Sequence, residues 1–275
     1  MKRRAFLMAC AAATAASAVQ GRASNTPRDA WRMDERTDLQ KLFQNADTQG
    51  TMVVRDVATE RVIVIESVRA RKRFLPASTF KIANALIALE TDVVADADNP
   101  VFPWDGKKRS IAAWNANHTL GSGFTVSSVP TYQQIALRIR PERMARFVQA
   151  FGYGNADIGG APIDQFWLEG NLRISAFEQI SFIERLYAEE LPVSKRAQAI
   201  VKDIMLLEGG QGSVVRGKTG WATQHKPGIG WLVGWLERSA GPAFFALNLD
   251  MKDVTLAPER LRIVKAVLRE LDIAP

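Results

Sequence analysis

The sequence is poor in cysteine and in long apolar runs, and each shortage narrows the possible functions. Cys10 is the only cysteine among 275 residues. It lies in an N-terminal segment that we expect to be removed, so neither thiol catalysis nor a cysteine-ligated zinc site is predicted. No run of eighteen apolar residues occurs, so no membrane-spanning helix is predicted.

Histidine, the usual base of serine hydrolases, occurs only twice. His118 lies in "NANHTL" and His225 in "TQHKPG", and both stretches are polar, turn-like and without an obvious orienting acid. A Gly-x-Ser-x-Gly nucleophile elbow is also missing. We therefore expect neither a Ser–His–Asp triad nor a metal site.

What is present suits a large folded core. The chain is 47% hydrophobic and 24% charged, and no repeat, low-complexity tract or linker rich in Gly, Ser or Pro divides it. The composition indicates one large domain or two closely packed ones.

Residues 1–23 have the pattern of a secretory signal peptide: a basic start, a short apolar middle and then small residues. The small residues allow cleavage after Ala18 or after Ala23. The stretch "RRAFL" also resembles a twin-arginine signal, so both export routes stay open. A mature chain without thiols suits an oxidising compartment. We expect a periplasmic protein.

Removal of this segment also changes the charge balance. The formal net charge falls from +7 to +3, because the segment contains no acidic residue and four basic ones, Lys2, Arg3, Arg4 and Arg22. So small an excess predicts neither a nucleic-acid partner nor stable membrane association.

Strand patterns gather at the two ends of the chain, and helical patterns lie between them. β-Branched or apolar runs that favour strands occur at 50–56, 61–67, 213–219, 229–237 and 243–250. Capping signals and apolar spacing predict helices that include 141–152, 175–187 and 258–271.

This order predicts an α+β fold. We expect an antiparallel sheet built from N- and C-terminal strands, flanked by terminal helices, with a helical lobe inserted and a cleft between the two. One domain would cover 24–275, with its sheet region at about 24–70 and 210–275 and its helical region at about 71–209.

The stretch "FLPASTFKIANALIAL" places Ser78 and Lys81 three residues apart at the start of an apolar helix. Pro76 favours the helix start, and residues i and i+3 share a helix face. A serine hydroxyl needs an adjacent base to be a nucleophile, and lysine becomes one when burial lowers its pKa. The ordinary alternative is that Ser78 caps the helix and Lys81 extends to solvent.

A second motif, Lys218-Thr219-Gly220, lies at the end of a predicted strand. It allows two interpretations. "GSVVRGKT" satisfies the phosphate-binding pattern Gly-x₄-Gly-Lys-Thr, but Val214 and Val215 favour a strand where that motif needs a turn before a helix. Alternatively, the strand end offers an ammonium and a hydroxyl along an edge where a carboxylate substrate could lie.

Five motifs in order make the second interpretation specific: Ser78-Thr79-Phe80-Lys81, Ser127-Ser128-Val129, Tyr153-Gly154-Asn155, "FWLEG" at 166–170, and Lys218-Thr219-Gly220. From about Trp31 to the C-terminus, the sequence resembles the class D, or oxacillinase-type, β-lactamases among the penicillin-recognising serine acyl-transferases.

Two positions need a choice of register. Matching "VSSVP" to the family's Ser-x-Val-Pro assigns the motif serine to Ser127, with Ser128 as the alternative. Matching "APERLRI" assigns a carboxylate-binding arginine to Arg260 rather than Arg262.

The resemblance implies a role for each matched residue. Ser78 is the nucleophile, Lys81 its base, and Ser127 with Lys218 a relay of a proton to the leaving nitrogen. The backbone amides of Ser78 and Trp221 form the oxyanion hole. The implied substrate-binding residues are Val129, Leu168, Thr219, Gly220, Trp221 and Arg260.

The resemblance also implies that carbon dioxide adds to Lys81, giving an N6-carboxylysine that serves as general base. Apolar neighbours would protect this carbamate, and the indole N–H of Trp167 would hold one of its oxygens; no other cofactor is implied. The implied activity is hydrolysis of β-lactam antibiotics through a serine acyl-enzyme. A penicillin-sensing domain that is acylated without turnover is the alternative.

Overall fold

A computed structural model describes residues 33–210 and 213–274, which form one compact unit. The expected signal peptide, including Cys10 and both cleavage sites, lies outside the described residues. In the part that is described, no helix is both long and apolar enough to cross a membrane.

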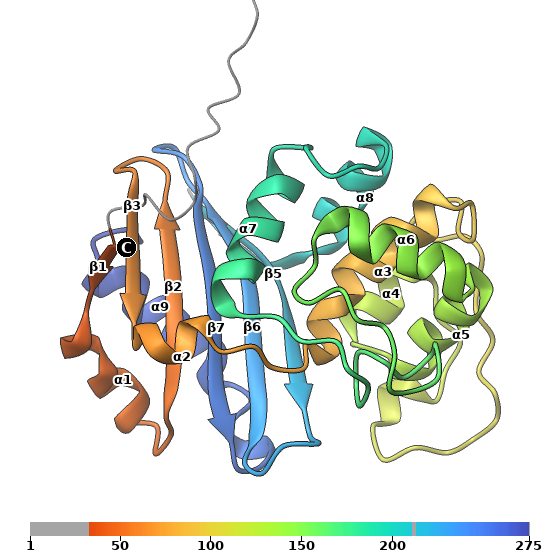
Figure 1. The fold of residues 1–275 in the computed structure, drawn as a ribbon, viewed down its shortest axis with the longest axis horizontal. Helices are drawn as coiled ribbons and strands as arrows, with labels where there is room; N and C mark the ends of the chain where they lie inside the picture. The colour runs from red at the N-terminus through yellow and green to blue at the C-terminus, as the bar shows by residue number, and fades with distance from the viewer. Residues whose placement is uncertain (1–32, 211–212, 275) are drawn as a thin grey trace, which may run out of the picture. The chain divides into compact units, whose positions relative to one another are not determined.

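A seven-stranded sheet forms the centre of the fold, in the order β1-β3-β2-β7-β6-β5-β4 (Figure 1). The strands are β1 (Met33–Glu35), β2 (Gly50–Asp56), β3 (Arg61–Ile65), β4 (Leu206–Gly210), β5 (Ser213–Ala222), β6 (Gly228–Glu237) and β7 (Ala243–Met251). N-terminal strand β2 pairs with C-terminal strand β7, so both ends of the chain build one sheet, as predicted.

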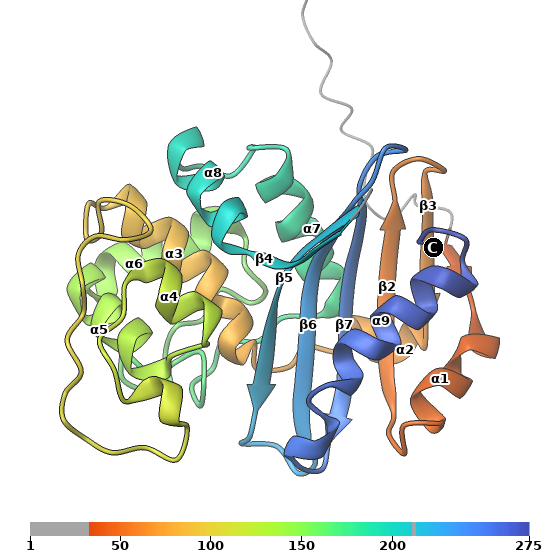
Figure 2. The ribbon, with the colours of Figure 1, turned by 180° about the vertical axis from the view of Figure 1, so that it is seen from behind.

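The helices lie on both faces and beside the sheet. They are α1 (Lys41–Gln44), α2 (Ser67–Arg71), α3 (Lys81–Glu90), α4 (Leu120–Thr125), α5 (Val129–Ile139), α6 (Pro141–Phe151), α7 (Ala176–Tyr187), α8 (Lys195–Ile204) and α9 (Glu259–Glu270), with 3₁₀ turns η2 (Thr37–Gln40), η3 (Ala77–Phe80), η4 (Ala112–Trp114) and η5 (Val254–Leu256). Helices α2 and α7 cover one face, α1 and α9 the other, and α3–α6 with α8 form a helical lobe beyond β5 (Figures 1 and 2).

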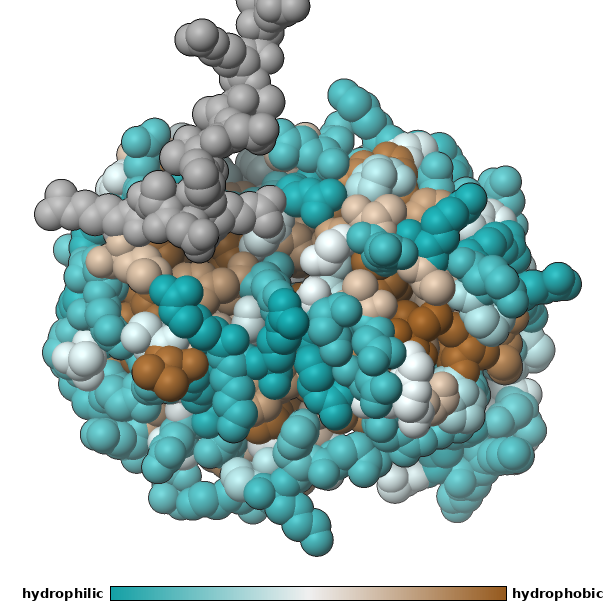
Figure 3. Space-filling model, in the orientation of Figure 1, coloured by the Kyte–Doolittle hydropathy of each residue, from teal (hydrophilic) through white to brown (hydrophobic). Residues whose placement is uncertain are grey.

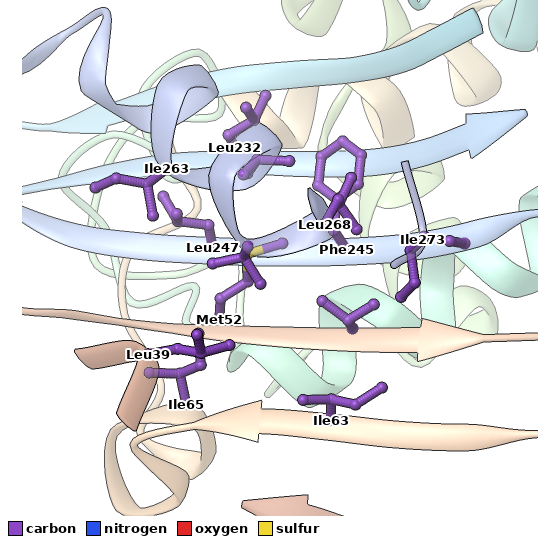
Figure 4. Close-up of a cluster of buried hydrophobic side chains, with 14 of the residues drawn as sticks. Leu39, Met52, Ile63, Ile65, Leu232, Phe245, Leu247, Ile263, Leu268 and Ile273 are labelled. Atoms are coloured by element: carbon purple, nitrogen blue, oxygen red, sulfur yellow. The ribbon is translucent and has the colours of Figure 1, made fainter. Parts of the chain in front are cut away.

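The main core lies between the sheet and the terminal helices. Alternate residues of β7, Phe245, Leu247 and Leu249, are fully buried against Val264 and Val267 of α9. Figure 4 shows this cluster, to which β2, β3 and β6 also contribute. Burying an apolar side chain of this size stabilises a fold by roughly 1.5–3 kcal/mol, so the cluster fixes the sheet beside which the helical lobe packs.

Two strands depart from the predicted pattern. β1 pairs with β3 in parallel, so the sheet is not wholly antiparallel. The second part of the sheet region was predicted to begin at about 210, but α8 ends at Ile204 and β4 begins at Leu206. β4 is exposed throughout and pairs only with β5, which explains why no alternation of apolar residues marks it.

Candidate active site

The catalytic turn is a 3₁₀ turn rather than the first turn of an α-helix. Ser78 lies in η3, and α3 begins only at Lys81. Ala77, just before the serine, has a φ of +47°, and its amide donates to the carbonyl of Trp167 at 3.0 Å. Such left-handed backbone in an alanine is uncommon, so the segment that carries Trp167 holds Ser78 in place.

Glycine is required where β5 meets this turn. A Cβ atom on Gly220 would lie 3.0 Å from the carbonyl oxygen of Pro76 and 3.2 Å from the amide of Thr79. Backbone can approach backbone this closely only without a side chain. Gly220 therefore lets β5 lie directly against the turn that carries Ser78.

Lys81 is fully buried, and its Nζ lies 3.0 Å from Oγ of Ser78. Burial, together with the nearby charge of Lys218, lowers the pKa of Lys81 well below its ordinary value. This shift favours the neutral amine, the form that can accept a proton. The alternative of a solvated lysine beside a capping serine is wrong, because no side chain caps η3 or α3.

Ser127 and Lys218 come from distant parts of the chain and form the opposite wall. The Nζ atom of Lys218 lies 3.0 Å from Oγ of Ser127, and Ser127 has a φ of +55°. Ser128 instead caps α5, accepting a bond from the amide of Thr131, and is fully buried. The geometry therefore separates the two candidate serines, since only Ser127 contacts another residue expected at the site.

Burial and the nearby charge of Arg260 lower the pKa of Lys218 to about 7. Lys218 also donates to the carbonyl oxygen of its neighbour Thr219 at 3.1 Å. Near neutral pH this lysine is consequently divided between its charged and neutral forms, which suits a group that passes a proton.

The edge of β5 presents main-chain groups to the cleft. The amide of Gly217 points away from β6 and donates to the carbonyl of Met205 at 2.7 Å. Amides alternate along a strand, so those of Thr219 and Trp221 point to the same side, where β4 has ended. The amide of Trp221 therefore lies on the side of β5 that faces away from β6.

Arg260, at the start of α9, reaches the same strand. Its guanidinium donates to the carbonyls of Gly220 at 2.8 Å and Ala257 at 3.0 Å, and it forms no ion pair within the described residues. Burial lowers its pKa to about 10, so it remains charged. Arg262 is exposed and paired with Glu259, so Arg260 is the arginine available to a substrate carboxylate.

Trp167 packs against the residue before Lys81, because its ring stacks on Phe80 at a centroid distance of 5.6 Å. The indole Nε1 of Trp167 is buried without a hydrogen-bond partner among residues 33–210 and 213–274. A buried donor without an acceptor is costly. Val129 begins α5 and Leu168 follows Trp167, and both are half-buried.

Two residues of this region were not predicted. The Nζ atom of Lys81 lies 5.2 Å from the ring centroid of Tyr132, a buried residue of α5. Gln179 of α7 donates to Oγ1 of Thr79 at 3.0 Å, and this hydroxyl donates to the carbonyl of Pro76 at 2.7 Å. Both residues occupy apolar helix faces, and their sequence spacing resembles that of ordinary core positions.

The Tyr153-Gly154-Asn155 motif is a structural turn. Gly154 has a φ of +57°, and a Cβ there would lie 2.0 Å from the carbonyl oxygen of Arg173. Asn155 bonds the main chain of Asn171 and Arg173, at 2.9 Å in each case. The motif therefore fixes the segment that carries Trp167.

The histidines do not form a triad with Ser78. Nε2 of His118 lies 2.8 Å from the carbonyl of Ala113, and His225 lies in the loop after β5. In the described part of the chain, no group of three His, Cys, Asp or Glu side chains could hold a metal ion.

Comparison with known proteins agrees with this geometry. The Penicillin binding protein transpeptidase domain family matches residues 50–271. β-Lactamase OXA-48 of Klebsiella pneumoniae is 45% identical over 233 residues, which cover 85% of this chain and 87% of that protein. The chain belongs to the class D β-lactamases. Another member, β-lactamase OXA-10 of Pseudomonas aeruginosa, is 40% identical over 85% of this chain and 88% of its own.

Solved class D β-lactamases also share the fold. A class D enzyme from Nostoc aligns with a TM-score of 0.82 and 40% identity, covering 86% of this chain and 98% of that one. One from Fusobacterium nucleatum subsp. polymorphum aligns with a TM-score of 0.84 and 37% identity, covering 88% and 100%. The predicted family and fold are confirmed. The nucleotide-binding interpretation is wrong, since residues 213–219 lie within strand β5 of a class D fold.

Proposed function

We propose that this chain hydrolyses β-lactams through an acyl-enzyme on Ser78. The observation that carries the proposal is the 3.0 Å contact between Oγ of Ser78 and Nζ of the fully buried Lys81. A hydroxyl becomes a usable nucleophile when a base lies beside it, and burial of Lys81 favours the uncharged form of its amine.

The first half-reaction opens the four-membered ring. Oγ of Ser78 attacks the lactam carbonyl as its proton leaves toward the base on Lys81, which in both half-reactions would be the carbamate that we propose on that residue, and the amides of Ser78 and Trp221 stabilise the oxyanion. The C–N bond then breaks, and Ser127, hydrogen-bonded to Lys218, delivers a proton to the departing nitrogen. Lys218, Thr219 and Arg260 hold the substrate carboxylate throughout.

In the second half-reaction, water attacks the ester carbonyl and releases Ser78. The water needs a base on the Lys81 side of the cleft, and the carbamate that we propose on Lys81 supplies a carboxylate there. The site fits such a group for two reasons: burial lowers the pKa of the Lys81 amine and so favours its neutral form, and the unpartnered Nε1 of Trp167 offers a hydrogen-bond donor.

We also propose that the chain is exported to the periplasm. The arguments are the order of basic, apolar and small residues over 1–23 and the lack of cysteine after Cys10. Fractionation of cells that express the full chain should recover the shortened protein in the periplasm, and recovery of the uncleaved protein in the cytoplasm would overturn this proposal.

Turnover of a chromogenic cephalosporin by the purified protein tests the function. Repeated turnover is expected, whereas a single burst equal to the enzyme concentration would favour the sensing alternative. Ser78→Ala should abolish both turnover and the acyl adduct seen by mass spectrometry. Its free energy of unfolding should change by less than about 1.5 kcal/mol, the upper end for one ordinary hydrogen bond.

A further inference from the structure

A cavity of about 480 Å³ lies on the face of the sheet that carries α2, apart from the active site. It is bordered by α2, the start of β2, the β5–β6 loop and the end of β7. Neither Ser78 nor any other residue assigned above to the reaction lines it. Figure 3 shows this face, whose centre is covered largely by hydrophilic residues.

The charge around this cavity is mainly positive. Arg69, Lys72 and Lys226 border it, and neither lysine forms an ion pair in the part of the chain that the structure describes. The two bordering acids are already engaged: Glu66 accepts the amide of Arg69 at 2.8 Å, and Asp250 pairs with the guanidinium of Arg69 at 2.8 Å. With Arg69 and Asp250 paired, Lys72 and Lys226 face one unpaired carboxylate, that of Glu66, so the border carries a net charge of one positive.

His225 forms part of the wall, and nearby positive charge affects its pKa. Its Nε2 atom is buried and has no hydrogen-bond partner among the described residues. Burial lowers the pKa of His225, and the charges of Arg173 and Lys72 lower it further. The imidazole is thus neutral near pH 7 and can keep a proton on Nε2 to offer to an acceptor.

The remaining wall combines two glutamines, Gln40 and Gln49, with an apolar part. Phe74 is buried, with its ring in edge contact with His225 at a centroid distance of 6.2 Å, and Ile229 and Pro227 lie beside it. The Nζ atom of Lys72 lies 5.3 Å from the ring centroid of Phe74. Cationic and apolar surface are therefore adjacent, which suits an anion that carries an apolar group better than a fully hydrated one.

We propose that this cavity is a second binding site, for a small organic carboxylate with an apolar ring or chain. Lys72 and Lys226 meet the carboxylate, His225 donates a hydrogen bond from Nε2, and Phe74 and Ile229 contact the apolar group. The site is independent of β-lactam chemistry, because it shares no residue with the acylation machinery.

The chain contains its own reporter for a test, because it has two histidines and only His225 lines the cavity. The C2–H signals of both imidazoles can be followed by proton NMR as benzoate is added at constant ionic strength. Benzoate should shift the His225 signal saturably and raise its pKa, since an anion offsets the two cations. The His118 signal should stay in place, and it also reports that each variant is folded.

Matched variants locate the site. Lys72→Gln combined with Lys226→Gln should weaken benzoate binding at least tenfold, whereas Lys265→Gln, which removes a lysine paired with Glu208 elsewhere, should not. Arg260→Ala removes the expected carboxylate anchor of the active site and should leave the His225 response intact. Loss of the response in Arg260→Ala, its persistence in the double variant, or equal binding of inorganic phosphate would each overturn the proposal.

Discussion

Lys218 and Ser127 lie 91 residues apart in sequence, yet Nζ of the lysine is 3.0 Å from Oγ of the serine. The serine is held in a left-handed conformation, with its amide bonded to the carbonyl of Phe124 at 3.1 Å. Lys218 is buried on the strand that forms one wall of the cleft. This contact joins the helical lobe to the sheet, and it brings together the two residues that we propose protonate the leaving nitrogen.

The adjacent serines provide a matched pair of variants. Ser127→Ala should lower kcat/KM by roughly 10²–10⁴-fold, the usual contribution of a positioned proton donor. Ser128→Ala should instead lower the free energy of unfolding by about 0.5–2 kcal/mol through loss of a helix cap, with kcat/KM little changed. Kinetics and urea denaturation of both variants check this. The reverse pattern would move the motif serine to Ser128.

The lowered pKa of Lys218 predicts a falling alkaline limb in the pH profile of kcat/KM. The ammonium is present below a pKa of about 7 and is lost as the pH rises through it, so carboxylate binding and proton delivery should weaken above neutrality. Arg260 is one of the two causes of this lowering. Arg260→Ala should therefore raise the pKa of Lys218 and move the limb to higher pH. A limb at the same pH in both proteins would show that Lys218 does not cause it.

Arg260→Ala should also raise KM more than it lowers kcat, because the carboxylate is held similarly in the ground state and the transition state. A charge-assisted hydrogen bond of about 1.5–3 kcal/mol corresponds to a loss of roughly 10–150-fold in kcat/KM. Arg262→Ala is the control, since Arg262 is exposed and paired with Glu259. An equal loss in the control variant would contradict the choice of Arg260.

Sequence patterns alone predicted only those contacts of the site that join residues close together in the chain. Ser78 and Lys81 lie within one turn of chain, so their spacing alone brings them together. The contact between Ser127 and Lys218 depends on how the helical lobe packs on the sheet, and only the resemblance to class D enzymes indicated it. Tyr132 and Gln179 were not predicted, because both lie on helix faces with mainly apolar neighbours. Such a position indicates core packing and does not reveal which residues the side chain contacts.

The same distinction, between local and long-range contacts, explains which strands could be predicted. Strands β2, β6 and β7 are buried along almost their whole length, so each is a continuous β-branched or apolar run, and these runs predicted strands. β1 has three residues and β4 is exposed throughout. Each is a strand because a neighbouring strand offers it hydrogen bonds, which leaves no pattern in its own residues.

The last prediction concerns the base at Lys81. Carbon dioxide adds only to a neutral amine, and burial with the charge of Lys218 lowers the pKa of Lys81 well below its ordinary value. As the pH falls through that lowered pKa, the amine takes up a proton and can no longer add carbon dioxide. Degassed enzyme should therefore slow during turnover below neutral pH and recover when bicarbonate is added.

Trp167→Phe is the sharpest variant for this test, because it keeps an aromatic ring beside Phe80 and removes the indole N–H. If that donor holds an oxygen of the carbamate, the variant should need more bicarbonate for the same activity. Its acyl-enzyme should also accumulate, because the deacylating water depends on the same base. Carbon-13 NMR with labelled bicarbonate gives a readout independent of activity: a carbamate signal is expected in the parent protein and a weaker one in the variant. If the spectrum of the parent protein shows no such signal, and bicarbonate leaves both rates unchanged, then Lys81 acts as a plain amine, and its 3.0 Å contact with Ser78 is itself the catalytic contact.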